Sequence, residues 1–76
     1  MQTVRQFTDR LWYVTDICII RKDHEPITYP TLTKFRKIAL WTGNVSSLRS
    51  ITAKEVNDRY VDSYGIIDNT LIIEVV

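Results

Sequence analysis

Apolar residues are most concentrated between positions 60 and 76, where two alternating runs flank the pair Asp68-Asn69. Asp and Asn both tolerate the positive φ that a two-residue hairpin loop needs, so the pattern predicts a β-hairpin closed on this pair. The register that follows pairs Ile67 with Thr70, Ile66 with Leu71, Tyr64 with Ile73, and Asp62 with Val75.

The two faces of this hairpin differ in composition, because directly opposite residues share a face of the sheet. The face predicted to meet the core carries Tyr64, Ile66, Leu71, Ile73 and Val75. Burying five such side chains would contribute on the order of 10 kcal/mol of gross stabilisation. The reverse face carries Ser63, Gly65, Ile67, Thr70, Ile72, Glu74 and Val76.

A capping box, Thr52-Ala53-Lys54-Glu55, predicts that a helix begins just before the hairpin, with Ile51 and Val56 placed as a hydrophobic staple. This helix either ends near Arg59, or runs on to Tyr64 and stops at Gly65. The longer helix leaves Ile66-Ile67 without a partner strand. The shorter one, near 52–59, is therefore preferred.

Earlier in the chain, Thr3 to Trp12 predicts a helix, with Thr3 and Gln6 as a capping box and an apolar stripe at Val4, Phe7 and Leu11. Residues 14–21 are rich in β-branched side chains and predict a strand. Both faces of this strand are apolar, which predicts a central position or a cover on both sides.

The middle of the chain begins with a connection, residues 22–30, that contains two prolines. Residues 34–42 alternate imperfectly and predict a second strand, ended by Gly43-Asn44. Residues 45–51 predict one helical turn or irregular chain, with Val45, Leu48 and Ile51 facing inward.

The order helix, strand, strand, short helix, strand, strand predicts a single α+β domain over residues 1–76. We expect a small, mainly antiparallel four-stranded sheet with an N-terminal helix and a short helix before the C-terminal hairpin. One layer of helix covers only one face of a sheet. The other face should then expose apolar residues, namely Ile20 or Cys18, Ile67, Ile72 and Val76.

Composition places the chain in an ordinary globular class, with 45% hydrophobic and 25% charged residues and a net charge of +1. A net charge this small would not by itself attract the protein to nucleic acid or to a membrane surface. The single cysteine cannot form an intramolecular disulfide, which fits a reducing compartment. The opening lacks a signal-peptide pattern, and no apolar run approaches a membrane span. We therefore expect a cytoplasmic protein.

Four stretches resemble short uncharacterised proteins of phages and mobile elements of Gram-positive bacteria: TVRQFTDRL, TDICIIR, WTGNV and IIDNTLIIEVV. The resemblance spans most of the chain. It implies a mobile-element origin and an accessory or inhibitor role, of which an inhibitor of a bacterial defence nuclease is one concrete version. The tract from Tyr29 to Phe35 departs from the tight hairpin usual in such proteins.

No catalytic constellation is present in the sequence. His24 is the only histidine and has no second ligand at metal-binding spacing, so a solvated turn is expected. Cys18 lies within an apolar run and is expected to be a buried thiol. The two glycines stand apart, so they form no phosphate-binding loop. We predict no enzyme activity, no cofactor and no metal.

Two kinds of binding surface compete. A contiguous apolar patch (Ile20, Ile67, Ile72 and Val76) would suit a protein partner, either a second copy or a larger host or phage protein; burial beneath residues 29–32 is the alternative. Basic residues near aromatic ones would suit single-stranded nucleic acid. These are Arg21, Lys22, Lys34, Arg36 and Lys37, with Tyr29, Phe35 and Trp41. We expect a protein-interaction module first and a weak nucleic-acid-binding accessory protein second.

Overall fold

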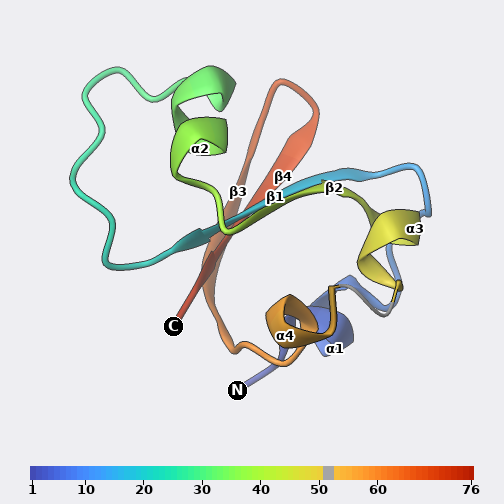
Figure 1. Ribbon diagram of the computed structural model, residues 1–76. Coiled ribbons are helices and arrows are strands. Elements are labelled where there is room, and N and C mark those ends of the chain that lie inside the picture. The colour runs from blue at the N-terminus through green and yellow to red at the C-terminus, as the bar shows by residue number, and fades with distance from the viewer. Residues whose placement is uncertain (51–52) are drawn as a thin grey trace.

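The computed structural model describes residues 1–50 and 53–76 and shows an α+β fold built on one four-stranded sheet (Figure 1). The strand order is β2-β1-β4-β3, antiparallel at both outer pairs and parallel between β1 and β4. The predicted fold class is therefore confirmed, with one parallel pair at the centre. The elements are α1 (Val4–Thr8), β1 (Asp16–Arg21), α2 (Leu32–Ile38), β2 (Trp41–Asn44), α3 (Val45–Leu48), α4 (Lys54–Asn57), β3 (Val61–Ile67) and β4 (Thr70–Val75).

The two central strands are buried on both faces of the sheet. In β1, the four residues from Ile17 to Ile20 are all buried, as the two apolar faces of this segment predicted. In β4, Ile73 and Val75 face one core cluster and Ile72 faces another. The molecule thus has a larger and a smaller core, one on each side of the sheet.

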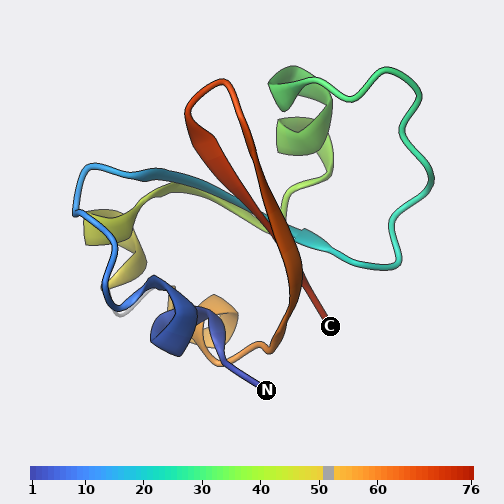
Figure 2. The same cartoon turned by 180° about the vertical axis from the view of Figure 1, so that it is seen from behind.

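Three short helices, α1, α3 and α4, cover the larger core (Figures 1 and 2). The capping box of Thr3 and Gln6 is present, but α1 ends at Thr8, well before Trp12. The inward turn predicted near residue 45 is α3, whose Val45 and Leu48 are buried. The helix predicted near residues 52–59 is α4; Ile51 and Thr52 lie outside the described residues.

The second strand predicted over residues 34–42 was wrong, because most of this segment is helix α2. Thr31 caps the helix by accepting a hydrogen bond from the Lys34 N–H at 3.3 Å. Leu32, Phe35 and Ala39 then fall at helical spacing and pack on the smaller core. The strand itself begins only at Trp41.

The C-terminal hairpin has the predicted turn, in which Asp68 and Asn69 both adopt positive φ. Three of the four predicted pairs are confirmed, whereas a bulge between Val61 and Ser63 places Val61, not Asp62, opposite Val75. The alternative helix running to Tyr64 is excluded, since β3 occupies residues 61–67.

The predicted core face of the hairpin is only half correct. Leu71, Ile73 and Val75 are buried on β4, but on β3 Tyr64 is 63% exposed and Ile66 is 71% exposed. The reason is the strand order. Because β3 lies at the edge of the sheet, it has a neighbouring strand on one side only, and its side chains stay more accessible to water than those of the central strand β4.

Candidate interaction surfaces

The apolar patch predicted to meet a partner is largely covered by α2. Ile20 is 0% exposed and Ile72 is 5% exposed, both packed with Cys18 beneath Leu32 and Phe35. The prediction of these two residues as a free surface was wrong, because the segment expected to be a strand supplies a second layer of helix. Ile67 is half-buried against the same cluster, and Val76 is 51% exposed at the last position.

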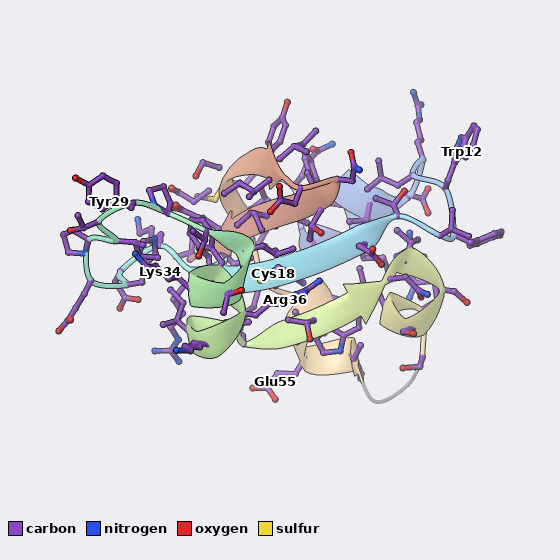
Figure 3. The ribbon with its side chains drawn as sticks, turned by 90° about the horizontal axis from the view of Figure 1, so that it is seen from above. Trp12, Cys18, Tyr29, Lys34, Arg36 and Glu55 are labelled. Carbon is purple, nitrogen blue, oxygen red and sulfur yellow. The ribbon has the colours of Figure 1, made fainter. Side chains whose placement is uncertain are left out.

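The predicted basic residues meet only in part. Arg21, Lys34 and Lys37 line an open groove of about 650 Å³ between α2 and the connection that follows β1. The Lys34 ammonium donates hydrogen bonds to the carbonyls of Thr28 and Tyr29, so it fastens this connection to α2 (Figure 3). Lys34 is therefore engaged within the chain.

Acidic groups partly offset the positive charge of this groove. Asp23 and Glu25 line it together with the basic residues. His24 Nε2 lies 3.5 Å from Glu74 Oε1, and Lys22 Nζ lies 3.9 Å from Asp62 Oδ1. The groove is thus mixed in sign rather than basic.

The aromatic residues expected among the basic ones are also dispersed. Phe35 packs on the smaller core and Trp41 on the larger one. Tyr29 alone of the three is strongly exposed, at 82%, in the connection before α2 (Figure 3). One exposed ring provides a single stacking position, whereas single-strand binders usually present several.

A different surface, which was not predicted from the sequence, carries three consecutive large apolar side chains that are all strongly exposed. Trp12 is 80% exposed, Tyr13 73% and Val14 77%. With the neighbouring Arg10 we call these residues the aromatic corner; Figure 3 shows Trp12 at the opposite end of the molecule from Tyr29. A signal was available, because three consecutive large apolar residues cannot all face one core from a helix or strand.

Backbone hydrogen bonds hold the aromatic corner in place. The Trp12 carbonyl accepts from the Thr15 N–H at 3.0 Å, and the Tyr13 carbonyl accepts from the Ser46 N–H at 3.1 Å. The Val45 N–H donates to the Thr15 carbonyl at 3.1 Å. The exposed side chains therefore project from a segment tied to both β1 and α3.

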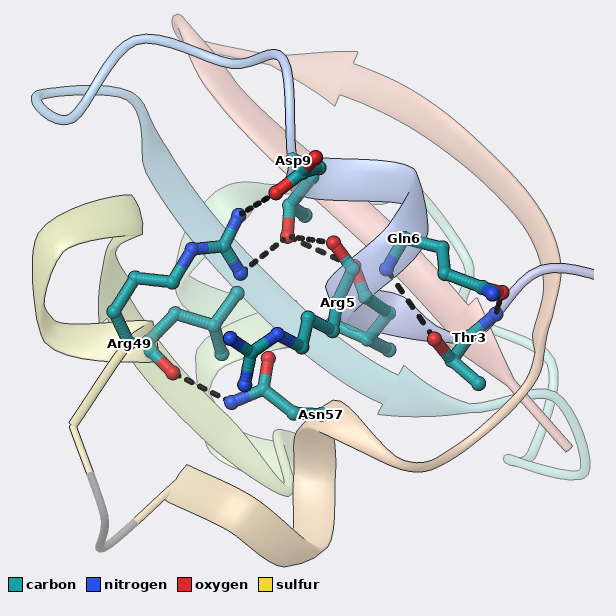
Figure 4. Close-up of polar contacts among 9 residues, drawn as sticks. Thr3, Arg5, Gln6, Asp9, Arg49 and Asn57 are labelled. Atoms are coloured by element: carbon teal, nitrogen blue, oxygen red, sulfur yellow. Dashed lines mark hydrogen bonds and ion pairs between the residues drawn. The ribbon is translucent and has the colours of Figure 1, made fainter.

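Arg49 strengthens the base of this corner by joining α3 to α1 (Figure 4). Its guanidinium donates to Thr8 Oγ1 at 3.3 Å and lies 3.8 Å from Asp9 Oδ1. The Thr8 hydroxyl in turn donates to the Val4 carbonyl at 2.8 Å. Arg49, Leu11 and Val45 also line a groove of about 570 Å³ next to the exposed aromatic side chains.

The chain's cysteine, Cys18, lies in β1 and lines neither groove. Cys18 is buried, and burial raises the pKa of its thiol, an effect that the Arg36 charge partly opposes. A raised pKa disfavours the thiolate, which is the nucleophilic form. Within residues 1–50 and 53–76, no three His, Cys, Asp or Glu side chains gather as metal ligands, and no helix is long and apolar enough to cross a membrane.

No protein-family model, curated protein or solved structure matches this chain. The resemblance to short phage and mobile-element proteins stays a prediction.

Proposed function

We propose that this chain is a small protein-interaction module that binds a partner protein through its aromatic corner. The observation that carries the proposal is the exposure of Trp12 and Tyr13 on a backbone fixed by hydrogen bonds. A backbone that is already held in place favours affinity, because less conformational freedom is lost on binding.

The residue types of the corner fit this role. Trp, Tyr and Arg are the residues most enriched at the energetic centres of protein interfaces, and Arg10, Trp12 and Tyr13 lie here within four positions. The adjacent groove, lined by Leu11, Val45 and Arg49, provides room for a side chain of the partner. Inserting both rings into a partner would remove a large apolar area from water.

A capture experiment with matched variants tests the proposal. Wild type, Trp12→Ala and Tyr29→Ala are immobilised, and the proteins retained from cells of the natural source are compared by quantitative mass spectrometry. Tyr29 is the matched control, because it is as exposed as Trp12 and lies at the opposite end of the molecule. A partner retained by wild type and Tyr29→Ala but reduced about tenfold or more with Trp12→Ala supports the proposal.

Two results would contradict it. Equal retention by all three proteins means that Trp12 is not part of the binding surface. Binding of the purified protein to phospholipid vesicles, with a blue shift of tryptophan fluorescence that is lost in Trp12→Ala, would instead assign the corner to a membrane surface.

Nucleic-acid binding is the second candidate, favoured by the placement of Arg21, Lys34 and Lys37 along one groove. Lys34 holds the connection, so Arg21→Glu with Lys37→Glu, which changes the other two basic residues of the groove, is the cleaner test. Filter retention of single-stranded RNA that fades steeply with salt and is lost in this variant would support binding. Absence of retention by wild type at low salt would end this candidate.

A further inference from the structure

The outer edge of β3 is a second exposed feature of the fold, separate from the aromatic corner. Within the described part of the chain, β3 is bonded along its length only to β4, so its other side is an edge of the sheet (Figure 2). The N-terminal segment covers only the beginning of this edge, where the Val61 N–H donates to the Gln2 carbonyl at 2.8 Å. Residues 62–67 remain open.

The composition of this edge does not protect it against pairing. Natural proteins usually block exposed edges with lysine, proline or a bulge. Between Asp62 and Asp68 the residues are Ser63, Tyr64, Gly65, Ile66 and Ile67, with no charge and no proline. The bulge of β3 lies at Val61/Ser63, near one end of the open stretch.

The hydrogen-bonding groups of the edge follow from the register of the hairpin. The pair that flanks a two-residue turn, here Ile67 and Thr70, is a hydrogen-bonded pair, and bonded and non-bonded pairs then alternate. Gly65 therefore directs its N–H and C=O towards β4. Tyr64 and Ile66 direct theirs outward, away from the sheet.

This pattern is complementary to itself. If two copies of β3 pair antiparallel about a twofold axis at Gly65, Tyr64 of each copy lies opposite Ile66 of the other. Both residues have outward groups, so each of these two pairs exchanges two hydrogen bonds. The side chains of Tyr64 and Ile66, 63% and 71% exposed in one copy, would then form one apolar cluster next to Phe7, whose ring centroid lies 4.9 Å from that of Tyr64.

Glycine suits the position on the axis. There the two strands form a non-bonded pair, in which the Cα atoms approach to about 4.5 Å. Gly65 has open space on its side-chain face, with no atom within 4 Å of an added Cβ. The Lys22 ammonium, 3.9 Å from Asp62, supplies positive charge where the Asp62 and Asp68 carboxylates of the two copies would face each other.

We propose that a second copy of this chain docks on β3, antiparallel and centred on Gly65, to make one continuous eight-stranded sheet. A contact of this length buries less than the roughly 1,200 Å² typical of stable complexes, so the dimer is weak. In sedimentation the average mass should rise from 8.9 kDa towards twice that value. The rise should occur between about 10 µM and about 1 mM.

Two variants test the contact by sedimentation. Ile66→Lys introduces a charge on the edge at a side chain that is already exposed, so the fold should persist and self-association should be lost. Thr42→Lys is the matched control, since it places a lysine at an exposed position of the opposite edge strand and should not change association. Wild type that stays monomeric at about 1 mM, or association unaffected by Ile66→Lys, overturns the proposal.

Disulfide trapping tests the register independently of stability. Gly65→Cys places two thiols across the axis, within the Cα separation that a disulfide allows, whereas Ser63→Cys on the same face places them about 13 Å apart. With oxidised glutathione, Gly65→Cys should form a covalent dimer at least tenfold faster than Ser63→Cys. The native Cys18 is buried and does not compete. Equal rates for the two variants would refute pairing centred on Gly65.

Discussion

The two isoleucines Ile72 and Ile66 of the C-terminal hairpin should respond very differently to truncation. Ile72 is 5% exposed beneath α2, whereas Ile66 is 71% exposed on the edge strand. Replacing a buried isoleucine by alanine costs about 2–5 kcal/mol through lost transfer energy and a cavity. The same change at an exposed strand position costs about 1 kcal/mol or less. Ile72→Ala should therefore be the far more destabilising variant.

The size of this difference is measurable in a chain of this length. A total free energy of unfolding of about 4–11 kcal/mol is expected from 0.05–0.15 kcal/mol per residue. With a urea slope of about 1 kcal/mol/M, Ile72→Ala should lower the unfolding midpoint by about 3 M and Ile66→Ala by about 1 M or less. Circular dichroism and tryptophan fluorescence follow unfolding at low micromolar concentration, where pairing of two edges is not populated.

Equal midpoint shifts, or a larger shift for Ile66→Ala, would refute the assignment of the covered face. A double-mutant cycle adds a test of α2 itself. Leu32 packs on the cluster that contains Ile72, so truncating both should be non-additive by about 0.5–3 kcal/mol. Truncating Leu32 together with Ile66 should be additive.

Substitutions at three further positions test individual contacts. Because burial raises the pKa of Cys18, the contribution of this thiol to stability is present below pH 9.0 and falls as pH rises above that value. In urea titrations, the stability advantage of wild type over Cys18→Ala should therefore shrink above pH 9.0. A constant difference between the two proteins across this pH range would contradict the prediction. Asn57 is 5% exposed and donates hydrogen bonds to two backbone carbonyls. Asn57→Asp places a carboxylate against these carbonyls, so it should lower the thermal unfolding midpoint more than Asn57→Ala does. The reverse order of midpoints would contradict the assigned hydrogen bonds. Lys34→Met removes the donor that fastens residues 22–31 to α2. Amide hydrogen exchange in residues 22–31 should accelerate, while the urea unfolding midpoint changes little. Unchanged exchange would show that other contacts hold this connection.

Local patterns in the sequence predicted much of the fold. The Asp68-Asn69 turn, the capping box of α1 and the two apolar faces of β1 each depend on residues close together in the chain. The secondary structure of residues 31–44 was predicted wrongly because two hydrophobic patterns overlap in this segment. Leu32, Phe35 and Ala39 have helical spacing, but the apolar residues from Ile38 to Trp41 are continuous and obscure it. The strand order of the sheet decides between the two, and strand order is a long-range property.

The wrong prediction for this segment, a strand instead of helix α2, also explains why the apolar interaction surface was predicted in the wrong place. Without α2, the sheet face around Ile72 would be the obvious exposed apolar patch; with α2 in place, that face is a second core. Two of the exposed apolar side chains then lie outside the covered faces: Trp12 beyond the end of α1, and Ile66 on the edge strand.

The aromatic corner depends on a contact between distant segments. Thr8 is the last residue of α1, and its hydroxyl accepts a hydrogen bond from Arg49 of the turn that follows α3. The Tyr13 carbonyl likewise accepts from Ser46 at the start of α3. Because these contacts hold residues 10–14 as a turn, Trp12 cannot continue the apolar stripe of α1 and projects outward. A protein that needed only a stable core would gain by burying this side chain, since burial of an exposed large apolar side chain is worth roughly 1.5–3 kcal/mol. The exposure of Trp12 on a fixed backbone is therefore the observation that most supports the proposed interaction.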